Sequence, residues 1–324
     1  MALPAKIKQF AEAIDLTRCR VLRPLPFIFL CGGKLRTANE GIKSVRESLL
    51  QTKSKRDRFS DDVRIILAET VSSSFDARVF DDLMEMETFV ASASEAVVLI
   101  LEGPGAIAEL GAFSQNPDIS DRLFSVVRHG RHPAKSFISD GPLRQLLNHK
   151  GEIAVGSYKW IDEEYNFAEK RAYEFSVPPE SLKSIDSDVT SYINRRAKRR
   201  FLGTDSIGGR LCLIAGLIQM CRGLKIDEVK SIARIAGISS TGRFIEKALF
   251  ALSEIGWIKE EQIQHDRYWI ATFHNKCIDL AYFSGKLNDT DRWLRIITDS
   301  LKHKNDNRLH LMRTADDKEF KLDI

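Results

Sequence analysis

The residues best suited to carry chemistry surround Glu109. The apolar run 96–103 (AVVLILEG) ends at Pro104-Gly105, and the next residues, Glu109 among them, predict the first turns of a helix. A carboxylate near a helix N-terminus is held in its ionised form by the helix dipole. Such a carboxylate is the nucleophile needed to capture an oxocarbenium-like sugar carbon. The position therefore suits a glycosidic nucleophile at Glu109, but from the spacing alone a surface glutamate that only compensates the dipole is the better interpretation.

Five short apolar runs alternate with helical stretches over the first 158 residues. These runs are 27–31 (FIFLC), 63–69 (VRIILAE), 96–103, 122–127 (RLFSVV) and 152–157 (EIAVGS). The alternation predicts an α/β domain with a flavodoxin- or Rossmann-like parallel sheet covered on both faces. Ligands of such domains bind at the carboxyl ends of the strands, where the predicted fold places Glu109.

The character of the chain changes after residue 158. Residues 159–222 form charged helical stretches and one apolar helix, and they predict a helical connector. Residues 223–285 predict a helix, a turn at Gly237, a second helix and a β-hairpin, which is the order of a DNA-binding winged helix. We expect a C-terminal helix and tail over 286–324.

Composition narrows the class of protein. The 324 residues are 43% hydrophobic and 29% charged, and the length favours two packed units. No apolar run reaches the roughly 18 residues of a membrane span, and the start lacks the apolar core of a signal peptide. We expect a cytoplasmic protein with no membrane contact. Five cysteines without C-x-x-C spacing or clustered histidines argue against a disulfide framework and a metal site.

The segment 103–114 (GPGAIAELGAFS) resembles the signature of the nucleoside 2-deoxyribosyltransferase family. The resemblance implies that Glu109 is the glycosyl-enzyme nucleophile. An Asp-Leu pair precedes the nucleophile in that family, and Asp82-Leu83 stands one residue further from it here. By resemblance Asp82 would protonate the leaving base, with Asp81 or Glu87 as substitutes. The family's acidic residue six positions before the nucleophile is Gly103 in this chain, with Glu102 one place away.

Several separated motifs resemble the deoxyribosyltransferase-like effectors encoded with bacterial retrons. They are IFLCGG (28–33), FDDL (80–83), ELGAFS (109–114) and KSFISDGPLR (135–144), followed by the connector and the winged helix. The resemblance implies an anti-phage toxin held by the retron reverse transcriptase and its multicopy single-stranded DNA (msDNA). It implies an N-glycosidase acting on a nucleotide, with NAD⁺ as the leading substrate rather than a cofactor. It also implies a homo-oligomer with shared active-site residues.

Further residues are candidates for contacts with substrate or nucleic acid. Glycines at strand ends let backbone N–H groups approach a phosphate or ribose, although a plain tight turn needs them equally. We expect substrate contacts from Cys31, Gly32, Gly33, Asp81, Gly103, Pro104, Gly105, Ser114 and Phe137. Phe137 would stack on a base, unless its loop is simply packed.

Basic and hydroxyl side chains at helix ends and in the wing are candidates for contacts with phosphates. They are Arg195, Arg196, Lys198, Arg199 and Arg200 of a basic run, Ser239, Ser240, Thr241 and Arg243 at the second helix, and Lys259, His265 and Arg267 in the wing. A solvated helix face would explain the basic run equally well, and some winged helices dock proteins instead.

Two other functions remain open at this stage. A nucleotide-sensing winged-helix transcription regulator needs no nucleophile and would tolerate the loss of Glu109. A metabolic deoxyribosyltransferase exchanges bases between nucleosides and has no need of a DNA-binding appendage.

Overall fold

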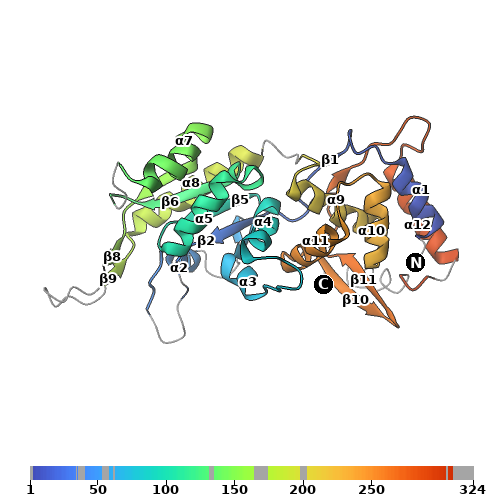
Figure 1. Cartoon of the computed structure of the whole chain (residues 1–324), viewed down its shortest axis with the longest axis horizontal. Coiled ribbons are helices and arrows are strands. Elements are labelled where there is room, and N and C mark those ends of the chain that lie inside the picture. Colours follow the sequence, from blue (N-terminus) through green and yellow to red (C-terminus); the bar gives the residue numbers. More distant parts are fainter. Residues whose placement is uncertain are drawn as a thin grey trace, which may run out of the picture. The chain divides into compact units, whose positions relative to one another are not determined.

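A computed structural model describes residues 3–33, 35, 41–52, 58–60, 63–130, 135–163, 174–197, 203–303 and 306–308 (Figure 1). The chain forms two compact units. The sheet unit comprises Pro26–Ser74 and Ser94–Arg199, and the helical unit comprises Met1–Leu25, Phe75–Ala93 and Arg200–Ile324. These units do not follow the linear boundaries at 158, 222 and 285, because the segments 1–25 and 75–93 pack with the C-terminal part.

A six-stranded sheet is the centre of the sheet unit. Its strands, in spatial order, are β3 (Arg58–Ser60), β4 (Val63–Leu67), β2 (Phe27–Cys31), β5 (Ala96–Ile100), β6 (Leu123–Arg128) and β7 (Val155–Tyr158). All neighbours are parallel except β3, which pairs antiparallel with β4. The five parallel strands are the five predicted runs, and their order 2-1-3-4-5 is that of flavodoxin-like sheets. The predicted α/β class and parallel sheet are confirmed.

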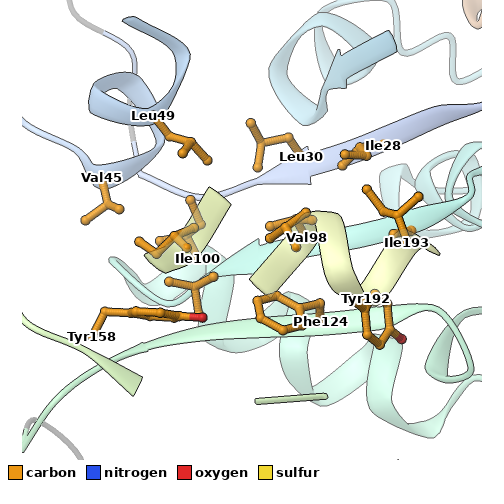
Figure 2. Close-up of a cluster of buried hydrophobic side chains, with 14 of the residues drawn as sticks. Ile28, Leu30, Val45, Leu49, Val98, Ile100, Phe124, Tyr158, Tyr192 and Ile193 are labelled. Atoms are coloured by element: carbon orange, nitrogen blue, oxygen red, sulfur yellow. The ribbon is translucent and has the colours of Figure 1, made fainter. Parts of the chain in front are cut away.

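One face of the sheet is covered by α2 (Val45–Thr52) and α8 (Pro179–Ala197). Figure 2 shows strand side chains such as Ile28 and Val98 packed with Leu49 of α2 and Tyr192 of α8. The Tyr192 hydroxyl donates to the carbonyl of Leu123 over 3.2 Å, which fixes α8 to the start of β6. Because α8 completes this core, the predicted helical connector is divided, and its first long helix belongs to the sheet unit.

The remaining elements of the sheet unit are short. The helices are α3 (Ala68–Ser73), α5 (Pro104–Gln115), α6 (Pro117–Ser120) and α7 (Arg144–Lys150), with the single turns η1 (Ser139–Leu143) and η2 (Glu152–Ala154). A separate antiparallel pair joins β8 (Ile161–Glu163) and β9 (Glu174–Ser176). Pro104 occupies the first turn of α5, where its missing N–H costs nothing, and α5 packs beside β5 and β6.

The helical unit contains the predicted helix, turn, helix and hairpin. These are α10 (Ile226–Ile235), α11 (Gly242–Glu254), β10 (Ile258–Ile263) and β11 (Asp266–Ala271) (Figure 1). The strands of this hairpin run through most of the polar segment 260–267 (EEQIQHDR), leaving a turn at Gln264, with φ of +55°, and His265. A two-stranded ribbon has no buried face at its tip, so apolar alternation did not mark its length.

Other elements complete the helical unit around these. They are α1 (Ala5–Ala13), β1 (Arg20–Val21), α4 (Leu83–Ala93), α9 (Ile207–Met220), β12 (Ile278–Asp279), which pairs with β1, and α12 (Thr290–His303). The helix α1 packs against α10 and α12, and α4 packs against α9 and α11. Phe80 and Phe89 from the segment 75–93 meet Phe250 and Phe244 of α11, with ring centroids 5.6 and 5.3 Å apart.

Membrane spans, disulfides and metal clusters are all absent from the described residues. None of the helices within them is both long and apolar enough to cross a membrane. All five cysteines are described and buried, and none of them forms a disulfide. In the described part of the chain, no group of three or more His, Cys, Asp or Glu side chains has the arrangement of a metal site.

The contact between α4 and α9 predicts the effect of a single methyl group. A Cβ at Gly208 would lie 2.1 Å from the carbonyl oxygen of Ser92 in α4, so Gly208→Ala should destabilise the protein by about 1–3 kcal/mol. At Gly242 a Cβ would meet only the Lys230 side chain at 3.8 Å, and Gly242→Ala should be neutral or slightly stabilising. Urea unfolding of both variants measures the difference. Equal stabilities would contradict the packing of α4 in the helical unit.

Candidate functional site

The candidate site lies at the carboxyl edge of the sheet, where β2 separates β4 from β5. The strand order reverses at this place, because the chain goes from β2 to β4 on one side and then to β5 on the other. Such a switch point is where doubly wound sheets bind their ligands. Cys31 ends β2, Glu69 follows β4, and Glu102 follows β5.

Glu102 holds the turn after β2 against the start of α2. Its carboxylate accepts hydrogen bonds from the backbone N–H groups of Gly33 (2.9 Å), Val45 and Arg46 (3.4 Å). A Cβ at Gly33 would lie 2.9 Å from Glu102 Oε2, so this close approach requires glycine. The N–H of Gly33, expected to face a phosphate or ribose, thus donates to a carboxylate of the protein. Burial raises the pKa of Glu102 despite these bonds.

Arg46 and Glu69 form an ion pair that the sequence did not reveal. The Arg46 side chain is 0% exposed, and its two terminal nitrogens bond the two carboxylate oxygens of Glu69. The Glu69 side chain is 48% exposed, so this pair reaches from the protein interior to solvent. The available signal was the position of Glu69 at the end of the second apolar run, beside the expected ligand edge.

Glu109 lies in the second turn of α5, with its carboxylate beside Cys31. The Cys31 thiol hydrogen-bonds this carboxylate, while the Oε2 atom is buried and has no hydrogen-bond partner among the residues that the structure describes. Burial, and then the charge of Glu69, raise the pKa of Glu109, and Arg46 and Cys31 oppose them. The expected stabilisation by the helix dipole is therefore not what dominates, because the dipole weakens beyond the first turn.

The other expected substrate residues differ in their surroundings. Gly103 and Gly105 border open space, and Phe137 is 87% exposed, so these residues form an accessible surface in the sheet unit. Ser114 is buried and donates to the carbonyl of Gly111 over 3.2 Å, which is a contact within α5.

The three expected acidic helpers belong to the helical unit rather than to the unit that holds Glu109. Asp82 caps α4 by accepting the N–H of Glu85 over 2.7 Å, and Glu87 is buried in α4. Asp81 pairs with Lys247 at 3.1 Å and with Arg243. Asp81 and Asp82 directly precede α4, and Glu87 lies within it. Their catalytic roles stay predictions.

The candidate nucleic-acid residues are also divided between the units. Arg195 and Arg196 lie in α8 of the sheet unit, and Lys198, Arg199 and Arg200 lie outside the described residues. Thr241 caps α11 by accepting the N–H of Phe244 over 3.1 Å, and the Ser240 hydroxyl donates to the carbonyl of Ile238. In the hairpin Lys259 pairs with Glu261, whereas His265 and Arg267 are exposed.

A groove of about 470 Å³ runs along the turn between α10 and α11. Ser239, Ser240 and Thr241 line it, together with Lys230 and Arg234 of α10. These two cations were missed because they precede the turn on the first helix, although their spacing of four residues places them on one face of α10. Arg243 is held by Asp81, while Lys230 pairs with Glu246.

Comparison with known proteins identifies the family to which this chain belongs. The model of the family described as STM3845 retron effector protein matches residues 42–260. This match covers more than half of the chain and reaches into both units, so the chain belongs to this family of retron effectors.

Two curated proteins from Escherichia coli are similar to parts of this chain. The "Retron Ec86 putative ribosyltransferase/DNA-binding protein" is 34% identical over 141 residues, 40% of this chain and 41% of that protein. The "Retron Ec73 putative ribosyltransferase/DNA-binding protein" is 28% identical over 220 residues, 66% of this chain and 68% of that protein. The chain therefore spans less than half the length of the first relative and about two thirds of the second.

The buried carboxylate of Glu109 predicts a pH-dependent gain in stability on its removal. Its raised pKa means that the native state binds the proton more tightly than the unfolded state, so stability is lost as pH rises through the folded pKa. At a pH above the folded pKa of Glu109, Glu109→Gln should raise Tm by about 2–4 °C. At a pH below 4.5, the ordinary pKa of a glutamate, the same variant should change Tm little. Thermal unfolding across this pH range measures it, with Glu180→Gln, exposed in α8, as control. A wild type more stable than Glu109→Gln at alkaline pH would contradict the prediction.

Proposed function

We propose that this retron effector hydrolyses the N-glycosidic bond of a nucleotide in its sheet unit, with Glu109 as the nucleophile and NAD⁺ as the leading substrate. One observation carries the proposal. The Glu109 carboxylate stands at the switch point of the sheet with a buried, unpartnered Oε2 atom. A buried polar atom without a partner is costly, and a catalytic role or a bound ligand is one of the reasons for which such an atom is retained.

The proposed reaction has two displacements at C1′. Glu109 attacks C1′, the bond to the base nitrogen breaks, and nicotinamide leaves with the electron pair as a neutral molecule. Water then attacks C1′ of the ribosyl-enzyme, loses a proton to solvent, and restores the Glu109 carboxylate. A base that leaves as a neutral molecule needs no general acid. This suits a sheet unit in which Glu69 is bonded to Arg46 and Glu102 is bonded to backbone N–H groups.

The charges of the site support a positively charged substrate. Among the described residues of the site, the carboxylates of Glu69, Glu102 and Glu109 all lie within the field of the buried Arg46 guanidinium, which bonds Glu69 directly. The surplus of negative charge complements the pyridinium ring of NAD⁺ and the oxocarbenium character of the transition state. Neutral nucleosides gain only the second of these interactions. Hydrolysis of NAD⁺ would deplete this cofactor in the cell and make the effector a toxin, which suits the anti-phage role that we propose for it.

We further propose that α10, α11 and the hairpin form a winged helix that binds the msDNA of the retron, with the reverse transcriptase as the other partner. The order of elements and the groove with Lys230 and Arg234 support binding to phosphates. Both relatives are named as DNA-binding proteins, which supports the same assignment. Exposed Arg267 in the hairpin adds a further cation to this surface.

Loss of the nucleophile should abolish turnover. Glu109→Gln keeps the size of the side chain but removes the attacking charge, and NAD⁺ consumption should fall by at least about 10³-fold. Nicotinamide release is measured for the purified protein alone and with the reverse transcriptase and msDNA, with Glu180→Gln as the matched control. An active Glu109→Gln enzyme would remove the mechanism. An inactive wild type in an assembled complex would remove NAD⁺ as the substrate.

Asp81 should weaken nucleic-acid binding by holding Arg243. Asp81→Asn releases this guanidinium and should tighten msDNA binding up to about fivefold, within the range of an exposed ion pair. If Arg243 then contacts a phosphate, the slope of log K against log salt concentration should also steepen by about 1, which corresponds to one released counterion. Asp279→Asn removes the same charge from an exposed pair with Lys276 and serves as control. Binding is measured by fluorescence-anisotropy titration. Equal effects of the two variants would show that only the change in net charge matters and would contradict a specific role of the Asp81–Arg243 pair.

A further inference from the structure

Arg46 is the buried cation around which the carboxylates of the candidate site are arranged. Its side chain is 0% exposed, and its backbone N–H donates to Glu102. Both terminal nitrogens bond Glu69, so the guanidinium is oriented by two parallel hydrogen bonds. A buried guanidinium must keep an ionic partner, because an unpaired buried charge costs several kcal/mol.

Glu109 is the competing partner for that guanidinium. Its carboxylate is within the electrostatic reach of Arg46 and Glu69, and Cys31 hydrogen-bonds it from the end of β2. One of its oxygens is nevertheless buried and unpartnered. A carboxylate in a full ion pair with arginine is a poor nucleophile, because attack would have to break that pair. The site therefore needs another carboxylate to occupy Arg46.

We infer that Glu69 is a positioning residue: it binds both terminal nitrogens of Arg46, whose Nε has no hydrogen-bond partner among the described residues, and so keeps the Glu109 carboxylate unpaired and available for attack on C1′. The nucleophilic role of Glu109 in this inference rests on the proposed function, whereas the Arg46–Glu69 ion pair does not depend on it. Within the described part of the chain, the charged and titratable groups that act on Glu109 are Arg46 from α2, Glu69 from α3 and Cys31 from β2. Glu102 contacts the backbone of Arg46 from the end of β5.

Removal of the Glu69 charge should redirect Arg46 to Glu109. In Glu69→Gln the new pair stabilises the ionised Glu109, so its titration moves down by about one pH unit or more. The acidic limb of the kcat–pH profile should move down with it, and kcat at neutral pH should fall about tenfold or more while KM changes little. Glu69→Asp keeps the charge and should restore the wild-type limb. A merely structural role of Glu69 would lower stability and leave the limb in place.

A stability cycle tests the same coupling without turnover. Tm is measured against pH for wild type, Glu69→Gln, Glu109→Gln and the double variant of the full chain. In the wild-type background, Glu109→Gln should raise Tm at alkaline pH. In the Glu69→Gln background this gain should shrink or reverse, because the folded pKa of Glu109 is then lower and its ionised form is paired.

The two measurements separate failure of the inference from failure of the proposed function. The same gain in Tm in both backgrounds at every pH would overturn the role of Glu69, even in an active glycosidase. A smaller gain in the Glu69→Gln background, together with wild-type protein that consumes no nucleotide in an assembled complex, would keep the Arg46–Glu69–Glu109 coupling and overturn the proposed reaction.

Discussion

The guanidinium of Arg46 is the interaction partner on which the edge of the sheet depends. Taking this charge out of water is expensive, and the two hydrogen bonds that Arg46 donates to Glu69 offset the cost. Since Arg46 begins α2 after β2 while Glu69 begins α3 after β4, the pair fixes two crossovers against each other. Glu102 adds the end of β5 through the backbone of α2. Three strand ends are thus held by charge rather than by apolar packing alone.

The crossover from β4 to β5 links this edge to the helical unit through the chain itself. A doubly wound sheet normally packs its crossover helices on its own faces. Here α4 packs instead with α9 and α11, and phenylalanines and the Asp81 ion pairs hold it there. The segment 75–93, which packs against α11 of the helix-turn-helix, therefore continues along the chain into β5, the strand that precedes Glu109. Truncation near residue 158 would remove the partners of α4, so the sheet unit is not an independent piece of sequence.

Sequence reasoning predicted what depends on local pattern. The apolar runs gave the five parallel strands because both faces of such strands are buried, and the helices near Gly237 followed from their periodicity. The strand-end position of Glu109 followed from the same pattern. The placement of α4 and α8 did not, because packing partners distant in sequence decide it. Asp82 was matched by its spacing from Glu109, and spacing alone does not say that residues 75–93 belong to another compact unit.

The raised pKa of Glu109 shows why the expected stabilisation of its ionised form by the helix dipole was an incomplete explanation. A helix dipole favours an ionised carboxylate only in the first turn, and Glu109 stands in the second turn, where burial raises its pKa. A buried acid reacts only when it is ionised, and it attacks poorly when a cation holds it. The arrangement of Arg46 with the half-exposed Glu69 meets both limits. Arg46 contributes a nearby positive charge, which favours the ionised form of Glu109. The half-exposed Glu69 accepts the hydrogen bonds of the Arg46 side chain, so the Glu109 carboxylate is not neutralised by a direct ion pair.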